Sequence, residues 1–193
     1  MDRGGELITI AFFKRSTLEV ARDLLGKYLF SKKNGVTCGG MIVETEAYLS
    51  DNDMASHSAR KKTNRNEVMF GPSGMIYVYL IYGIHYCFNL VCGREGVGTA
   101  VLVRALEPVK GVQYMKRRRE KQEITELASG PAKLTQALGI DNKDNGKFIN
   151  KNEIFLLDGE KKSHNIGRSS RIGISKSKEL DYRYFIKCNR HVS

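Results

Sequence analysis

The chain has little proline, no repeated or low-complexity tract, and no pair of cysteines spaced for metal binding. Only three of its 193 residues are proline and 41% are hydrophobic, which is typical of a globular protein. A chain of this length fits one domain that buries a core of its own, whereas two domains would each be small. We therefore expect a single domain over residues 1–193.

The four cysteines are scattered and form no CxxC pair. Structural zinc sites usually take their ligands from closely spaced pairs, so the sequence predicts no metal site. Spacing typical of disulfides is also missing, and free thiols are the usual state in a reducing compartment. The opening MDRGGELITIAFFKRS is too polar and short for a secretory signal. We expect a cytoplasmic protein.

Acidic residues are scarce relative to basic ones. Lys and Arg number 32 against 21 Asp and Glu, which gives a net charge of +11 at pH 7. An excess of this size favours a polyanionic partner, and nucleic acid is the commonest one. The alternative at this point is a soluble protein that is merely basic.

Charged side chains are absent from Gly71 to Gly93, although 27% of the chain is charged. This stretch is long enough for a membrane-spanning helix. Pro72, His85, Asn89 and the alternation of tyrosines with β-branched residues favour two strands instead. We therefore predict a hairpin and no membrane association.

Helix and turn signals divide the rest of the chain, and together they predict one α+β domain rich in antiparallel strands. In the first third of the chain, we expect a helix capped by Ser16 and ended by Gly26, strands over 28–30 and 36–48 joined at Asn34-Gly35, and a polar loop over 50–66. The uncharged hairpin follows, and then a strand over 99–106 closed by Glu107-Pro108. The last part should form helices over 110–122 and 131–138, and short strands from Ile154 separated by a basic loop over 161–178.

Two carboxylates lie near the end of the strand that begins at Val36. Side chains alternate along a strand, so Glu44, Glu46 and Tyr48 share one face. Carboxylates are unfavourable in a core but suit a pocket, where one of them could act as a general base toward water. The alternative is a strand edge exposed to solvent.

Tyrosines gather in the uncharged hairpin. Tyr77 and Tyr79 share a face with Ile81, and Tyr82 falls at the turn. A tyrosine at a hairpin tip can enter between base pairs as a wedge. Tyr79 and Tyr48 could form a slot that stacks on a base. The alternative is that these tyrosines belong to the core or the sheet surface.

Seven blocks stand in the order found in a known enzyme family, and they span nearly the whole chain. The blocks are VETEAY (43–48), ASH (55–57), RN..MF (65–70), YVYLIYG....FN (77–89), VLVRALEP (101–108), SGPAKLTQALGI (129–140) and RIGI (171–174). In these blocks the chain resembles the alkyladenine, or 3-methyladenine, DNA glycosylases of base-excision repair.

The resemblance implies a compact α+β domain around a curved, open-barrel-like antiparallel sheet, with flanking helices and a protruding hairpin. It implies a monofunctional, metal-free enzyme without a cofactor that acts as a monomer on double-stranded DNA. Such an enzyme flips an alkylated purine out of the duplex and hydrolyses its N-glycosidic bond, leaving an abasic site. Deaminated and etheno purines are further candidate substrates.

Individual roles follow from the matched blocks. Glu46 matches the general base that activates the attacking water, and Arg104 matches the arginine that holds this water and Glu46 in place. Tyr82 matches the tyrosine that fills the gap left by the flipped nucleotide.

Four further residues match the base-binding pocket of the family. Tyr48, His57 and Tyr79 match the residues that sandwich the flipped purine, and His57 also offers a hydrogen bond to the base edge. Asn89 matches the asparagine that discriminates against the exocyclic amine of guanine. Without the resemblance, His57 would be read as an ordinary loop histidine.

The C-terminal end departs from the family pattern. The family carries a proline before an Arg-Phe-Tyr strand and a glycine shortly after it, whereas this chain has the stretch from Asp181 to Cys188. Two other classes remain as alternatives, namely a non-catalytic damage-binding protein and an RNA-binding or ribosome-associated basic protein. The carboxylate at Glu46 favours the enzyme over the first.

Overall fold

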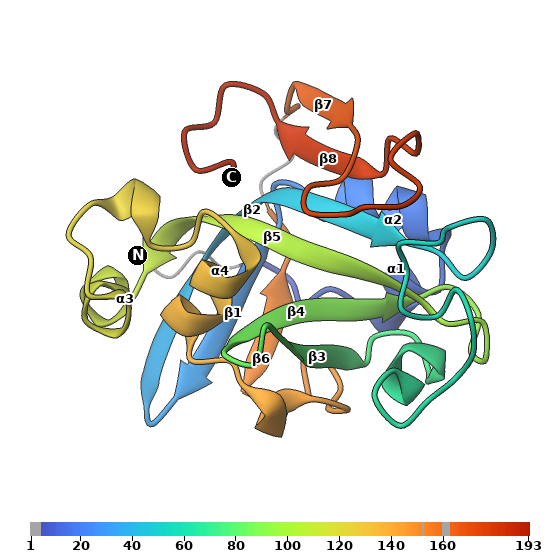
Figure 1. Cartoon of the computed structure of the whole chain (residues 1–193). Coiled ribbons are helices and arrows are strands. Elements are labelled where there is room, and N and C mark those ends of the chain that lie inside the picture. Colours follow the sequence, from blue (N-terminus) through green and yellow to red (C-terminus); the bar gives the residue numbers. More distant parts are fainter. Residues whose placement is uncertain (1–4, 152, 160–162) are drawn as a thin grey trace.

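The computed structural model describes residues 5–151, 153–159 and 163–193, in which eight strands form one antiparallel sheet (Figure 1). The central order is β3-β4-β5-β2-β1-β6, and β8 pairs with both β2 and β7. The strands are β1 (Tyr28–Lys33), β2 (Val36–Tyr48), β3 (Ile76–Ile81), β4 (His85–Cys92), β5 (Thr99–Lys110), β6 (Ile154–Leu157), β7 (Ile166–Ser169) and β8 (Arg183–Ile186).

Strand β2 changes one of its partners along its length. Its first half pairs with β1, and residues 44–46 pair with β8 instead, while β5 follows the other side of β2. The register with β5 shifts on both sides of Glu44, and irregularities of this kind bend and twist a strand. The segment with Glu44 and Glu46 is therefore enclosed between β5 and β8.

The expected helices form beside this sheet, and the capping signals explain their limits. The Ser16 hydroxyl accepts a hydrogen bond from the Glu19 amide at the start of α2. Pro131 opens α4, and Gly139 ends it with φ +67°. The helical segments are α1 (Ile10–Phe13), α2 (Thr17–Asp23), α3 (Val112–Arg119), α4 (Pro131–Leu138) and the 3-10 turns η1 (Glu67–Phe70), η2 (Ile124–Glu126) and η3 (Asn142–Asp144).

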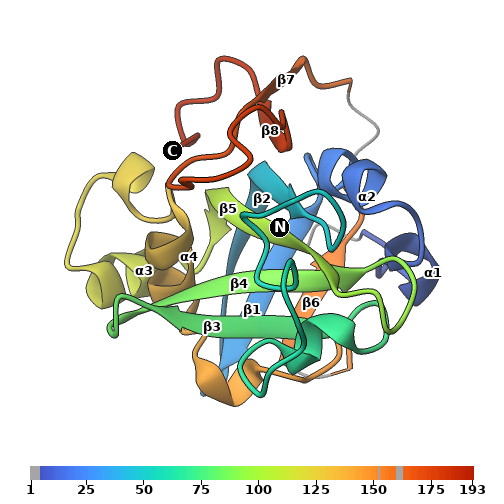
Figure 2. The same cartoon turned by 45° about the vertical axis from the view of Figure 1, so that its right-hand side comes forward.

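The helices cover the sheet at two places. Helix α2 packs against β2 and β5, whereas α4 packs against β4 and β5 with α3 beside it. Figures 1 and 2 show α3 and α4 together on one side of the molecule and α1 and α2 on the other. Buried aliphatic and aromatic side chains fill the space between helices and sheet, including Phe13, Leu24, Phe88 and Leu106. The predicted α+β fold with a curved antiparallel sheet is confirmed.

The uncharged stretch forms the predicted hairpin of β3 and β4. Its turn places Tyr82 and Gly83 in the left-handed region, with φ values of +53° and +73°. The turn stands out from the molecule in Figure 2, and 84% of the surface of Tyr82 is exposed. Among the described residues, no helix is long and apolar enough to cross a membrane.

Several predicted boundaries are wrong. Helix α2 ends at Asp23 and not at Gly26, and α3 covers Val112–Arg119 and not 110–122. Strand β5 continues through Glu107 and Pro108 to Lys110, because Pro108 pairs beside the register shift at Gly39/Gly40, where a missing amide is tolerated. The predicted basic loop contains strand β7, whose sequence IGRS has no strand signal and which forms by pairing with β8. Residues 161 and 162 of that predicted loop lie outside the described residues.

Candidate active site

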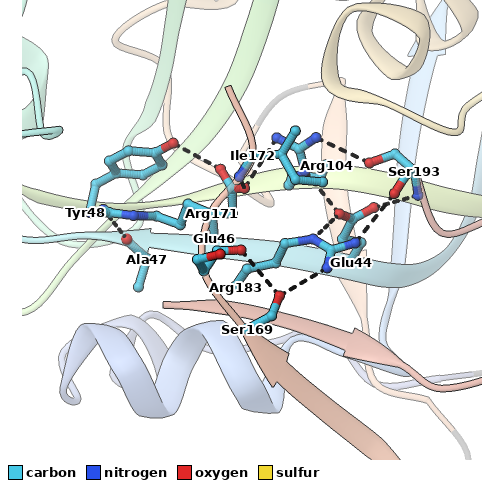
Figure 3. Close-up of polar contacts among 11 residues, drawn as sticks. Glu44, Glu46, Ala47, Tyr48, Arg104, Ser169, Arg171, Ile172, Arg183 and Ser193 are labelled. Atoms are coloured by element: carbon cyan, nitrogen blue, oxygen red, sulfur yellow. Dashed lines mark hydrogen bonds and ion pairs between the residues drawn. The ribbon is translucent and has the colours of Figure 1, made fainter. Parts of the chain in front are cut away.

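Glu46 lies near the end of β2 and is completely buried. Its Oε2 accepts a hydrogen bond from the Tyr48 hydroxyl at 2.8 Å, and its Oε1 accepts one from the Ile172 amide at 2.8 Å. The guanidinium Nη1 of Arg104 is 3.2 Å from Oε1 (Figure 3). The alternative of a solvent-exposed strand edge is therefore wrong, because this carboxylate is held inside the protein by three donors.

Arg104 connects the two carboxylates of β2. Its Nε donates to Glu44 Oε1 at 3.0 Å, its Nη1 approaches Glu46, and its Nη2 donates to the Ser193 hydroxyl at 3.1 Å. Burial acts to lower the pKa of Arg104, but the carboxylates of Glu46 and Glu44 outweigh burial and raise that pKa above its ordinary value. Arg104 is thus a permanent positive charge beside Glu46.

Glu44 is also completely buried, but its partners differ from those of Glu46. Besides Arg104, it accepts hydrogen bonds from Arg183 Nε at 2.6 Å and from the Ser193 amide at 2.7 Å. Two arginines and a backbone amide therefore occupy this carboxylate. It serves as the anchor of Arg104 and Arg183, and Glu46 is the better candidate for chemistry.

A cavity of about 330 Å³ opens next to these residues. Its wall includes every residue predicted for the base pocket, together with Arg104 and Tyr82, while Glu46 lies buried behind Tyr48 and Arg104. The predicted residues in the wall are Tyr48, His57, Tyr79 and Asn89. Residues from strands β2, β3, β4 and β5 and from two loops are thus brought together around one hollow.

Aromatic rings line one side of this cavity. The ring centroids of His57 and Tyr79 are 4.5 Å apart with their planes at 69°, and those of Tyr77 and Tyr79 are 5.4 Å apart. Burial raises the pKa of Tyr79, with a further contribution from Cys87, so the Tyr79 hydroxyl stays neutral. Burial, followed by the charge of Arg65, lowers the pKa of His57.

Tyr77 has a role in this site that the sequence reasoning did not give it. Its hydroxyl lies 2.9 Å from His57 Nδ1, and burial raises the pKa of Tyr77 to about 12. Asn89 stands opposite Tyr77 in the hairpin and donates to its carbonyl oxygen at 3.1 Å. Strand alternation already placed Tyr77 on the face of Tyr79, and this signal could have identified it.

Asp53 and Arg171 form a second buried ion pair that the sequence reasoning missed. Arg171 donates to both oxygens of Asp53, at 2.6 and 2.7 Å, and to the Ala47 carbonyl oxygen at 2.9 Å. The Arg171 guanidinium also lies 4.6 Å from the centre of the Tyr48 ring (Figure 3). This pair joins the loop after β2 to the segment that carries the Ile172 amide.

A second hollow of about 550 Å³ adjoins the aromatic cavity and shares His57 and Gly173 with it. It runs between the loop after β2 and residues 173–176, and we call it the basic groove. Its cationic side chains come from both segments. They are Arg60, Lys61, Arg65 and Lys176.

Metal ligands do not cluster in the described part of the chain, where no group of three or more His, Cys, Asp and Glu side chains could hold an ion. The four cysteines are free, with Cys38, Cys87 and Cys92 buried and Cys188 exposed. Glu46, Arg104 and Tyr48 are the polar side chains in contact with one another beside the aromatic cavity.

Comparisons with known proteins agree with this arrangement. Residues 11–190 match the model of the methylpurine-DNA glycosylase family. A protein of Carboxydothermus hydrogenoformans is 50% identical over 189 residues, covering 97% of this chain and 98% of the relative. Proteins of Methanoculleus marisnigri and Francisella tularensis are 49% and 47% identical over 187 residues, covering 95% of this chain and 96% of each relative. All three relatives carry the provisional name 3-methyladenine DNA glycosylase.

These matches define the class of the protein as a hydrolase of the DNA glycosylase type, with a place in DNA repair. The chain belongs to the methylpurine-DNA glycosylase family.

Proposed function

We propose that this protein excises alkylated purines from double-stranded DNA by hydrolysing the N-glycosidic bond with a water activated by Glu46. The observation that carries this proposal is the contact of Glu46 with Arg104 and Tyr48, both of which line the aromatic cavity. A carboxylate in direct contact with two residues of the wall of a base-sized pocket suits general-base attack on a sugar.

The hydrogen bonds of Glu46 leave room for one water. A carboxylate has about four lone-pair positions. Among the described residues, Ile172 and Arg104 approach Oε1 and Tyr48 approaches Oε2. The remaining position on Oε2 can accept the hydrogen bond of a water, and Glu46 then takes up the proton that this water gives up.

The aromatic cavity supplies a place for the extruded base. Tyr48, His57 and Tyr79 present π-faces and edges on which a purine stacks. Alkylation at a ring nitrogen makes the base positively charged, which strengthens its attraction to these rings and makes it a good leaving group. Asn89, fixed by its hydrogen bond to the Tyr77 carbonyl oxygen, discriminates against guanine by occupying the space of its exocyclic amine.

The hairpin and the basic groove bind the duplex around the extruded nucleotide. A base inside the stack is out of reach of Glu46, so the nucleotide must be flipped and its gap filled. Tyr82 is exposed at the hairpin tip and lines the same cavity, so it is placed to fill this gap. The groove cations Arg60, Lys61 and Lys176 are available for phosphates.

Several finer properties belong to the same proposal. The enzyme acts as a monomer in the cytoplasm, at the nucleoid, without a metal or cofactor, and leaves an abasic site. The names of the relatives point to 3-methyladenine as a substrate. Hypoxanthine and ethenoadenine are further candidates, although a neutral base leaves less readily and requires protonation of its ring.

The test is base release from defined duplexes. Oligonucleotides that carry 3-methyladenine, 7-methylguanine, hypoxanthine or ethenoadenine are incubated with the protein, and abasic sites are then cleaved with alkali. We expect release of at least one methylated base above its spontaneous rate. Release of none of the four bases would overturn the proposal.

A matched variant separates the enzyme from a damage-binding protein. Glu46→Gln keeps the size of the side chain but removes the base, so excision should fall by at least a hundredfold while binding to damaged duplex is kept. Unchanged excision by this variant would show that another group activates the water.

A further inference from the structure

The segment after β8, residues 189–193, folds back over β5 and β2, and we call it the C-terminal segment. Asn189 Nδ2 donates to Glu107 Oε2 on β5 at 2.8 Å, and only 2% of the surface of His191 is exposed. Figures 1 and 2 show this end of the chain on the same side of the molecule as β7 and β8. The segment is thus docked, and its docking brings Ser193 to the two buried carboxylates of β2.

Ser193 contacts three members of this network (Figure 3). Its amide donates to Glu44 Oε2 at 2.7 Å, and its hydroxyl accepts a hydrogen bond from Arg104 Nη2 at 3.1 Å. Its carbonyl oxygen accepts a hydrogen bond from Arg183 Nη2 at 3.3 Å. One residue of the C-terminal segment therefore contacts both arginines and the carboxylate that anchors them.

These contacts fix the orientation of Arg104. A guanidinium is a planar fork, so holding two of its nitrogens determines where the third one points. Glu44 holds Nε and the Ser193 hydroxyl holds Nη2, and this leaves Nη1 directed at Glu46. Without the hydroxyl, the guanidinium of Arg104 can rotate about the Cδ–Nε bond. This rotation lengthens the 3.2 Å contact between Nη1 and Glu46 Oε1.

We propose that Ser193 is a positioning residue, and that the C-terminal segment orients Arg104 toward Glu46 for the hydrolytic step. This inference rests on the proposed function, because it assigns Arg104 and Glu46 to that step. The inference goes beyond the proposed function because it makes the rate of hydrolysis depend on Ser193, which does not line the base pocket. Base binding should not depend on Ser193, since the pocket wall is formed by other residues.

Three variants at one position dissect these contacts. Ser193→Ala removes the hydroxyl that binds Arg104 and keeps the amide hydrogen that binds Glu44. Ser193→Pro removes both the hydroxyl and the amide hydrogen. Ser193→Thr restores a hydroxyl. Because Ser193 is exposed, none of these changes creates a cavity in the core. Ser163→Ala, at another exposed serine, is the matched control.

The measurements are the single-turnover rate constant on the best substrate of the panel, and the dissociation constant for a duplex carrying a non-hydrolysable abasic analogue. We expect Ser193→Ala to lower the rate constant about tenfold, the order expected for one hydrogen bond to a charged group. Ser193→Pro should lower it further, Ser193→Thr should restore at least a third of the wild-type rate, and the dissociation constant should change less than twofold. Ser163→Ala should match the wild type in both.

The outcomes separate the two proposals. Active wild-type protein with unchanged rates in Ser193→Ala and Ser193→Pro would overturn the positioning role and leave the proposed function intact. The positioning role would also be overturned if the three variants weakened DNA binding and the rate constant in parallel, because that pattern indicates a general structural effect. Wild-type protein that releases no base would overturn the proposed function and this inference with it.

Discussion

Asp53 and Arg171 stand 118 residues apart in the chain, yet they form a two-point ion pair that is entirely closed to solvent. Arg171 and the residue that follows it both contact the candidate site. The Arg171 guanidinium lies over the ring of Tyr48, and the next residue, Ile172, donates its amide to Glu46. The two donors that hold Glu46 besides Arg104 are thus both supported by one buried ion pair.

Breaking this pair should cost stability and activity together. Asp53→Asn leaves Arg171 as a buried charge without its counter-ion, so we expect the free energy of unfolding to fall by about 3 kcal/mol. Single-turnover excision should fall as well, because Tyr48 and the Ile172 amide lose their support. Denaturant unfolding and the rate constant measure these effects.

A double-mutant cycle provides the control. Asp53→Asn combined with Arg171→Gln removes both charges, and its loss of stability should be smaller than the sum of the two single losses. Additive losses would show that the two side chains are not energetically coupled.

Tyr82 should matter for lesion binding and hardly at all for folding. An exposed ring at a hairpin tip buries little surface in the free protein, so Tyr82→Ser should change the free energy of unfolding by less than about 0.5 kcal/mol. Binding to a damaged duplex should weaken, because the gap in the stack is no longer filled. Tyr82→Phe keeps the ring and should bind like the wild type. A variant Tyr82→Ser that loses mainly thermal stability would contradict the wedge role.

The basic groove should determine part of the salt dependence of DNA binding. Each phosphate contact contributes close to one unit to the slope of log affinity against log salt concentration. Replacing Arg60 and Lys61 by Ala should therefore reduce this slope by about 1 to 2. Lys32→Ala, at an exposed lysine on β1, is the matched control and should leave the slope nearly unchanged. An unchanged slope in the double variant would place the phosphates elsewhere.

His57 should make the fold less stable in acid. Burial and then Arg65 lower the pKa of His57 below its ordinary value of 6.5, so between the two pKa values the unfolded chain binds more protons than the folded one. The stability contributed by neutral His57 is therefore complete above pH 6.5 and is lost as the pH falls toward the folded pKa. Unfolding free energies measured from pH 7.5 to 4.5 should decline less in His57→Gln than in the wild type. The exposed His85 supplies the control, since His85→Gln should retain the wild-type slope.

Cys188 should tolerate glycine with a gain in stability. It follows β8 with φ +61°, a conformation that disfavours side chains and that glycine adopts without strain. Cys188→Gly should raise the free energy of unfolding by about 1 kcal/mol, because the strain of the left-handed conformation is relieved. Cys188→Ala keeps the strain and should stay near the wild type. A less stable glycine variant would show that the thiol makes a stabilising contact.

Local patterns were sufficient for most of the fold. Ser16, Pro131 and Gly139 mark helix limits through backbone groups close in the chain, so their positions can be recognised without the rest of the protein. Strand β7 could not be predicted in this way, because it exists through its pairing with β8. The extension of β5 through Pro108 likewise depends on pairing with another strand, β2.

The candidate site, like the fold, could be predicted from the sequence only in part. Glu46, Arg104 and the hairpin tyrosines stand within recognisable blocks. The structure places Arg104, Tyr79 and Tyr82 around one cavity and Glu46 in contact with Arg104, and the roles of these residues are proposals. Asp53, Tyr77 and Ser193 were not assigned roles from the sequence. Each acts on the site through a hydrogen bond or ion pair with a distant residue, and no local pattern encodes such a partner.

The sequence by itself determined the family and the hairpin with its uncharged tyrosine face, because these depend on residue types at short or fixed spacings. The tertiary structure alone decided that both carboxylates of β2 are buried and that Arg104 lies between them. It also decided that the hairpin, the loop after β2 and the C-terminal segment meet at one site. The reason is that burial and charge pairing arise only when segments far apart in the chain pack together and exclude water.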